Sequence, residues 1–196
     1  MKSIKELYRI GTGPSSSHTM GPRKAAEMFL ERHPDAASFK VTLYGSLAAT
    51  GKGHMTDVAI IDTLHPTAPV EIVWQPKVFL PFHPNGMTFA ALDSNDKVQE
   101  NWTVYSIGGG ALAENNDNPT IESPDVYDME NMTEILQWCE DTGKSYWEYV
   151  KECEEEDIWD YLAEVWATMK DAIHRGLEAE GVLPGPLNLR RKASTY

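Results

Sequence analysis

The sequence predicts an α+β fold, in which a mostly antiparallel sheet is layered with helices and a long helix follows towards the C-terminus. Three observations lead to this class. Apolar residues recur at helical spacing in the first and last thirds of the chain, they alternate with polar residues in the middle, and turn-rich pieces such as PFHPNG separate the alternating runs. Because 41% of the 196 residues are hydrophobic, the chain can bury a substantial core.

Two helices are predicted at the start of the chain. Ser3 can cap a short helix that runs to Ile10 and stops at the following glycine. A second helix begins at His18 or Pro22 and ends at Arg32, because a histidine-proline pair follows it. The segment between the two helices is therefore held next to a helix start.

The middle of the chain predicts a third helix and four strands. Helical spacing from Gly53 ends at Leu64, where another histidine-proline pair follows. Phe39, Val41 and Leu43 alternate with polar neighbours, which is typical of a strand with one face in water. Together with three later runs rich in β-branched and aromatic residues, this segment is expected to form the sheet: FKVTLYGSL, EIVWQPKVF, GMTFAALDS and NWTVYSIGG.

The last third of the chain predicts helices again. After a polar, proline-broken stretch at 113–125, helical spacing runs from Met132 to Thr142. Residues 149–173 carry one apolar stripe, which predicts a long helix packed against the core of its own chain; a groove for a partner is the less favoured interpretation. The acidic run at 152–157 is expected to be a face in solvent.

Composition and charge argue against several classes of function. A formal net charge of -13 disfavours a nucleic-acid partner, which would need clustered lysines and arginines. We see neither a signal peptide nor an apolar run of the roughly 18 residues that a membrane span needs, so we expect a cytoplasmic protein without a membrane partner. Cys139 and Cys153 lie outside any C-x-x-C pattern, and no metal site within this chain is predicted.

Four stretches place polar groups beside glycines: PSSSHT, YGSLAATGKGHMTD, PFHPNGM and SIGGG. The first holds hydroxyls and an imidazole near a helix start, where free backbone N–H groups and the helix dipole can receive a carboxylate. A serine that only caps the helix would explain one or two of these residues. We therefore favour a binding role for this stretch.

The second stretch departs from a phosphate-binding loop. Five residues, not four, separate Gly45 from Gly51, and a glycine stands where a hydroxyl residue should follow the lysine. What remains is a glycine-rich turn with His54 and Asp57 at a helix start, where a neutral imidazole can act as a general base or merely cap the helix. A tight turn explains PFHPNGM, and SIGGG permits either an ordinary turn or close approach to a ligand.

Taken together and in this order, GTGPSSSHTMGPRKA, LYGSLAATGKGHMTD, HPNGM, YSIGGG and LPGPLNLRRKA resemble the N-terminal β domain of the iron-sulfur L-serine dehydratases, also called L-serine ammonia-lyases. The similarity spans essentially the whole chain. It implies a fold similar to the serine-binding regulatory domain of phosphoglycerate dehydrogenases. It also implies a division into a β domain at 1–143, a helical extension at 144–180 and a linker at 181–196 towards an α domain.

The same resemblance implies a reaction and its residues. L-serine would be converted to pyruvate and ammonia, with a [4Fe–4S] cluster that the α domain, not this chain, binds. His18 and His54 would transfer protons or orient serine, and the choice of base between them stays open. Other positions would line or border the substrate pocket, namely Ser15, Ser16, Ser17, Thr19, Asp57, Asn85, Gly108 and Gly109.

Partners and alternatives follow from this interpretation. The expected partners are L-serine and a serine dehydratase α domain or subunit, the expected assembly is a dimer, and the chain alone should be inactive. The alternative is a stand-alone amino-acid-sensing module that binds serine without turning it over. An interaction module whose Trp159 and Trp166 stripe docks a partner helix comes third.

Overall fold

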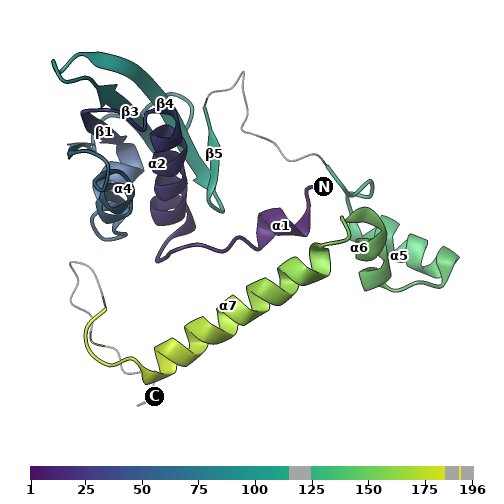
Figure 1. Cartoon of the computed structure of the whole chain (residues 1–196). Helices are drawn as coiled ribbons and strands as arrows, with labels where there is room; N and C mark the ends of the chain where they lie inside the picture. Colours follow the sequence, from purple (N-terminus) through teal and green to yellow (C-terminus); the bar gives the residue numbers. More distant parts are fainter. Residues whose placement is uncertain (115–124, 184–189, 191–196) are drawn as a thin grey trace. The chain divides into compact units, whose positions relative to one another are not determined.

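The computed structural model describes residues 1–114, 125–183 and 190 (Figure 1). The described chain divides into two compact units. We call residues 11–114 the sheet unit, and residues 1–10 together with 125–180 the helical unit. In the described part of the chain, no helix combines the length and the apolar character needed to cross a membrane. The domain limits expected from the sequence stay a prediction.

The sheet unit confirms the α+β class. Within the described residues its sheet has the strand order β2-β1-β3-β4-β5, in which β1 and β2 are parallel and the other neighbours antiparallel. The likeness to the regulatory domain of phosphoglycerate dehydrogenases stays a prediction. The strands are β1 (Ser38–Tyr44), β2 (Val70–Gln75), β3 (Gly86–Leu92), β4 (Val98–Gly108) and β5 (Ala111–Ala113).

Helices of the sheet unit cover one face of the sheet (Figure 1). A single turn of π-helix, η1, continues directly into α2, whose second residue is a proline. Proline is tolerated at this place because the first N–H groups of a helix have no partner inside it. The helices are η1 (Ser16–Met20), α2 (Gly21–Arg32), α3 (Gly45–Thr50) and α4 (Thr56–Leu64).

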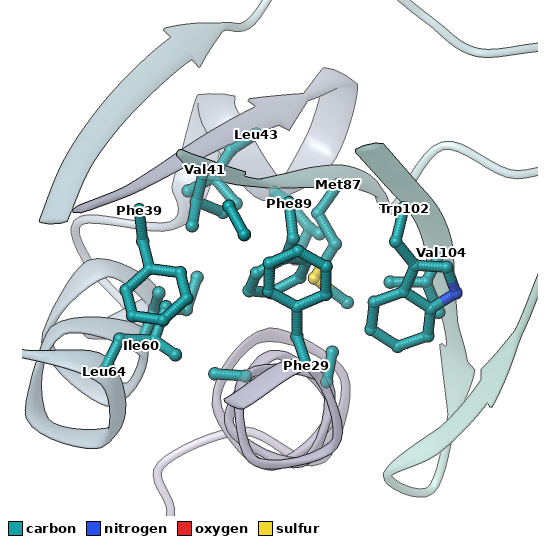
Figure 2. Packing of buried hydrophobic residues seen from close by; sticks show 14 of the residues in the cluster. Phe29, Phe39, Val41, Leu43, Ile60, Leu64, Met87, Phe89, Trp102 and Val104 are labelled. Atoms are coloured by element: carbon teal, nitrogen blue, oxygen red, sulfur yellow. The ribbon is translucent and has the colours of Figure 1, made fainter. Parts of the chain in front are cut away.

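The core lies between these helices and the sheet. Period-two alternation places Val41 and Leu43 of β1 on the buried face, as the sequence predicts. Figure 2 shows Phe29 of α2 pointing towards the sheet, where its ring packs against those of Phe89 and Trp102. The rings of Phe29 and Trp102 stack with their centroids 6.0 Å apart. This core fixes α2, and with it the segment that precedes α2.

One strand ends earlier than its apolar pattern suggests. The alternating run was expected to continue to Leu47, but β1 stops at Tyr44 and α3 begins at Gly45. Gly45 has a φ of 47°, a left-handed conformation that turns the chain out of the strand. The short elements α3 and β5 were not predicted.

The helical unit contains α1 (Ile4–Leu7), α5 (Met132–Thr142), α6 (Tyr146–Cys153) and α7 (Ile158–Glu178). Ser3 caps α1 as predicted, since its side chain accepts a hydrogen bond from the N–H of Lys5. The prediction for α5 is also confirmed, because Gly143 ends this helix with a φ of 70°.

The long C-terminal helix predicted from the sequence is confirmed as α7, but it begins at Ile158, and Tyr146–Cys153 form the separate helix α6. The break falls at the acidic run, where Glu154 is half-buried instead of solvated. Its carboxylate accepts hydrogen bonds of 2.6 Å from Ser3 Oγ, 2.7 Å from the N–H of Ile4 and 2.6 Å from the Tyr127 hydroxyl. The donors Ser3 and Ile4 hold the first residues of the chain against the end of α6, and the third donor joins Tyr127 to the same carboxylate.

The apolar stripe of α7 is only partly buried within the helical unit. Ile158 is buried at the start of the helix, and Leu162 and Val165 are half-buried. The described residues of the helical unit leave the other members of the stripe uncovered, namely Trp159, Trp166, Met169 and Ile173. The expectation that this stripe packs against the core of its own chain stays a prediction.

Candidate functional site

The serine cluster forms the start of η1. Ser15 stands before the first helical residue, and its Oγ accepts a hydrogen bond of 3.1 Å from the N–H of His18. Ser17 Oγ lies 2.9 Å from Nδ1 of the same histidine. Ser16 is exposed between them. One serine thus caps the helix, as the simpler interpretation required, while a second contacts an imidazole.

A further serine completes the surroundings of His18. Ser46 follows Gly45 at the end of β1, and its Oγ lies 3.2 Å from His18 Nε2. The N–H of Ser46 donates to the carbonyl of Pro84, which joins this turn to the HPNG stretch. Sequence reasoning did not single out Ser46. The available signal was a glycine followed by a serine directly after a strand. A turn at this place puts the side chain that follows the glycine at the end of the sheet.

The structure brings the two candidate histidines together. Their ring centroids are 4.8 Å apart, with the planes tilted by 40°. His54 Nδ1 lies 3.0 Å from the carbonyl oxygen of Thr50. A carbonyl only accepts hydrogen bonds, so Nδ1 carries the proton of the neutral ring and Nε2 keeps a lone pair. That lone pair is the group a general base needs.

The surroundings of His18 favour its neutral form. Burial lowers its pKa, and the neighbouring His54 ring lowers it further, whereas the bond to Ser46 acts in the opposite direction. Both ring nitrogens of His18 contact serine hydroxyls. The two histidines are therefore chemically different: the His18 ring has partners at both nitrogens, whereas among the described residues the His54 ring has a hydrogen-bond partner at Nδ1 and none at Nε2.

Two buried threonines connect the segments that carry these histidines. Thr19 Oγ1 donates a hydrogen bond of 2.7 Å to the carbonyl of His54, and it accepts one of 3.2 Å from the N–H of Ser15. Thr56 Oγ1 donates to the carbonyl of His18. Thr19 was expected to bind substrate, which stays a prediction; Thr56 was not singled out, although it belongs to the same GKGHMTD stretch.

The remaining predicted residues lie in the same unit. Asn85 bonds to Ser106 of β4, the strand that leads into the glycines. The Asn85 side-chain amide donates to the carbonyl of Ser106 at 3.2 Å, and the N–H of Ser106 donates to the carbonyl of Asn85 at 3.0 Å. Gly108 and Gly109 have positive φ angles and lead from β4 into β5. Asp57 Oδ1 accepts from the N–H of Val58 at the start of α4.

Close packing joins the glycine stretch to the serine cluster. A Cβ atom on Gly21 would lie 2.4 Å from Ser106 Oγ, so only glycine fits where α2 meets the end of β4. Contacts between neighbouring stretches therefore connect all four motifs of the sequence within the sheet unit.

The described residues do not fit an iron-sulfur cluster. Among the residues that the structure describes, no group of three or more histidine, cysteine, aspartate or glutamate side chains could hold a metal ion. The two cysteines of the chain, Cys139 and Cys153, lie in α5 and α6 of the helical unit. A [4Fe–4S] cluster requires four ligands, most often cysteines.

Comparison with known proteins relates the chain to one family. The family model described as serine dehydratase beta chain matches residues 3–75 and 63–117. The chain is 34% identical to an L-serine dehydratase from Haemophilus influenzae, over 100% of this chain and 54% of that protein. It is also 34% identical to L-serine dehydratase 1 from Escherichia coli, over 99% of this chain and 53% of that protein.

The matches cover only part of each relative. The chain spans about half the length of the curated relatives it matches. The alignment with the Haemophilus influenzae protein extends over 247 positions although the chain has 196 residues, so that relative contains residues without a counterpart here. The two family matches overlap at 63–75, a range that includes the end of α4 and the whole of β2.

Proposed function

This chain belongs to the serine dehydratase beta chain family, and from that premise we propose that it forms the β part of an L-serine dehydratase. In this proposal the chain supplies substrate-binding and proton-transfer residues, and an α part completes the site and binds a [4Fe–4S] cluster. The observation that carries the proposal is the pair of imidazoles 4.8 Å apart, flanked by serine hydroxyls.

The proposed reaction needs proton transfer at carbon and at oxygen. L-serine loses its Cα proton and its β-hydroxyl, which leaves as water, and the resulting aminoacrylate takes up water and releases ammonia to give pyruvate. The Cα proton is weakly acidic and hydroxide is a poor leaving group, so both changes require catalysis. A cluster bound by the α part would supply a Lewis acid for the hydroxyl. The steps assigned here concern only side chains of this chain.

We assign removal of the Cα proton to His54, because its Nε2 lone pair is available and Thr50 holds the ring in the required tautomer. His18 would orient the substrate through the hydroxyls of Ser17 and Ser46, which contact both of its ring nitrogens. A neutral ring suits this role because it does not compete for the substrate carboxylate, which can then bind the N–H groups at the start of η1.

The other predicted residues keep supporting roles in the proposal. Ser15, Ser16 and Ser17 would bind the carboxylate, where the positive end of the helix dipole favours an anion. We assign the border of the same site to Asp57, Asn85, Gly108 and Gly109. Asp57 lies at the start of α4, Asn85 bonds to Ser106 of β4, and the two glycines lead out of β4. A dimer, and inactivity of the chain alone, are further expectations of the proposal.

Reconstitution tests the proposal. The chain is co-expressed with the part of the Haemophilus influenzae L-serine dehydratase that it does not match, and pyruvate formation from L-serine is measured under anaerobic conditions. We expect turnover with both parts and none with either alone. If calorimetry shows that the chain binds L-serine while no combination forms pyruvate, the sensing module is the correct function. Absence of both binding and turnover contradicts both functions.

A further inference from the structure

Thr19 and Thr56 make a reciprocal pair of hydrogen bonds across the site. The hydroxyl of Thr19, one residue after His18, donates to the backbone of His54. The hydroxyl of Thr56, two residues after His54, donates to the backbone of His18. Both threonines are almost fully buried, with 2% and 0% of their surface exposed. Each histidine segment is thus bonded to the other by a side chain of its own.

Thr56 supplies the His18 carbonyl with a donor from outside its own helix. Four residues after His18 stands Pro22, which has no N–H and cannot make the α-helical bond to this carbonyl. Thr56 Oγ1 donates to it from the start of α4, 38 residues further along the chain.

The His54 carbonyl lies outside its helix altogether. The first carbonyl of the α4 ladder belongs to Met55, which accepts from the N–H of Ala59. Met55 has a φ of 57°, a left-handed conformation that is uncommon for a residue with a side chain and that the surrounding structure must hold in place. Thr19 bonds to the carbonyl just before this turn. The backbone at His54 is therefore held by a contact from η1.

We propose that Thr19 and Thr56 are positioning residues whose two crossed hydroxyl–carbonyl bonds set the distance and tilt between the His18 and His54 rings. The catalytic consequence rests on the proposed function, whereas the geometric statement does not. Neither threonine needs to touch substrate in this role, because the Thr19 hydroxyl already donates to His54 and accepts from Ser15.

The same helix offers a matched control. Thr63 Oγ1 donates at 2.8 Å to the carbonyl of Ala59, four residues earlier in α4. This bond stays within one helix, whereas those of Thr19 and Thr56 connect segments 35 and 38 residues apart. Valine at any of the three positions keeps the branched shape and removes the hydroxyl. Serine keeps the hydroxyl and removes the methyl group.

The geometric test uses NMR on the full 196-residue chain. A nuclear Overhauser cross-peak between ring protons of His18 and His54 is expected in the wild type, given the 4.8 Å between centroids. Thr19→Val and Thr56→Val should lose it, and the pKa of His18 should rise towards its ordinary value as the rings separate. Thr56→Ser and Thr63→Val should keep the cross-peak. Circular dichroism shows which variants are folded.

Each outcome decides the proposal. Folded valine variants that keep the cross-peak and the wild-type titration of His18 overturn it. If neither valine variant folds, the serine variants decide: a folded Thr19→Ser or Thr56→Ser chain without the cross-peak shows that the hydroxyl does not set the geometry. Loss of the cross-peak in Thr63→Val contradicts the proposal as well, because removal of a threonine hydroxyl outside the crossed bonds would then also separate the rings.

The catalytic consequence is measured in the reconstituted enzyme. Misplacement of a catalytic group by about 1 Å can lower a rate about 10²-fold. We expect kcat to fall by about that factor in Thr56→Val with KM little changed, and Thr56→Ser to restore most of the rate. Unchanged kcat overturns the catalytic part. If the wild type shows no turnover, the proposed function fails, while the NMR result still tests the crossed bonds.

Discussion

Two imidazoles in contact acquire different chemistry from their hydrogen bonds. His18 has serine hydroxyls at both nitrogens, whereas in the part of the chain that the structure describes the His54 ring is hydrogen-bonded at Nδ1 only, to a carbonyl. In the proposed enzyme this difference separates a group that orients from a group that accepts a proton. The choice of base, which residue types alone leave open, thereby acquires a structural argument.

Replacement of the proposed base tests this assignment. His54→Ala should lower pyruvate formation by about 10²-fold to 10⁴-fold, the contribution expected of general base catalysis, and should leave the affinity for L-serine close to that of the wild type. His65→Ala is the matched control, because His65 is exposed at the end of α4. Steady-state rates and calorimetry measure the two effects. Wild-type rates in His54→Ala would remove His54 from the mechanism.

The lowered pKa of His18 makes stability depend on pH. Between its lowered pKa and the ordinary value of about 6.5, the unfolded chain binds more protons than the folded chain. The free energy of unfolding therefore decreases as pH falls through this window and is unaffected by His18 above it. Urea titrations at pH 7.5 and below 6 should show a smaller decrease in His18→Gln than in the wild type. Equal decreases would contradict the lowered pKa.

At the scale of the element, short turns position the site. Gly45 ends β1 with a left-handed φ, and the next residue, Ser46, then reaches His18. The same glycine lies against the loop before β3, since its N–H donates to the carbonyl of Val78 and the Ser46 N–H donates to that of Pro84. The contact between Ser46 and His18 thus depends on Gly45.

Gly45→Ala should destabilise the sheet unit. A left-handed residue with a side chain costs about 1–2 kcal/mol, and a Cβ at this position would lie 2.6 Å from the Pro84 carbonyl oxygen. The free energy of unfolding should fall by at least about 1 kcal/mol in a urea titration. Gly53→Ala is the control, since a Cβ there meets its nearest atom at 3.4 Å and its φ is not left-handed. Equal effects in both variants would refute the argument.

Glu154 joins α1 to α6 in the helical unit. Removing its charge in Glu154→Gln weakens three hydrogen bonds, from Ser3, Ile4 and Tyr127. We expect a loss of about 1–3 kcal/mol in stability and faster amide hydrogen exchange at Ile4. Glu156→Gln, an exposed change in the same acidic run, should alter neither quantity. Unchanged exchange in Glu154→Gln would show that these bonds do not hold α1.

Prediction from the sequence succeeded for elements with a long run of regular apolar spacing. It failed where contacts with residues far along the chain determine the local structure. The alternation in β1 and the helical spacing in α5 are local signals. Glu154, at the break between α6 and α7, accepts a hydrogen bond from Ser3, 151 residues away, and no window around residue 154 reveals this contact. Within the site, His18 and His54 follow from residue type, whereas Ser46 and Thr56 were not singled out, and their contacts with the His18 residue join segments 28 and 38 residues apart.

At the scale of the whole molecule, one aromatic residue joins helix and sheet. Phe29 is fully buried, and its ring centroid lies 5.5 Å from that of Phe89 and 6.0 Å from that of Trp102. Phe29→Ala should lower the free energy of unfolding by about 3–5 kcal/mol, the usual cost of such a cavity. Phe79→Ala, at a residue 64% exposed, should cost far less. Comparable losses in urea titrations would contradict the described core.

The helical unit is discontinuous along the chain, and this affects the order in which the protein is made. Ser3 and Ile4 are synthesised about 150 residues before Glu154, which accepts their hydrogen bonds. During translation residues 1–10 are therefore made well before the helices that bind them, and the whole sheet unit is synthesised in between. A single protease cut after residue 10 would consequently release no fragment as long as the contacts of Glu154 persist.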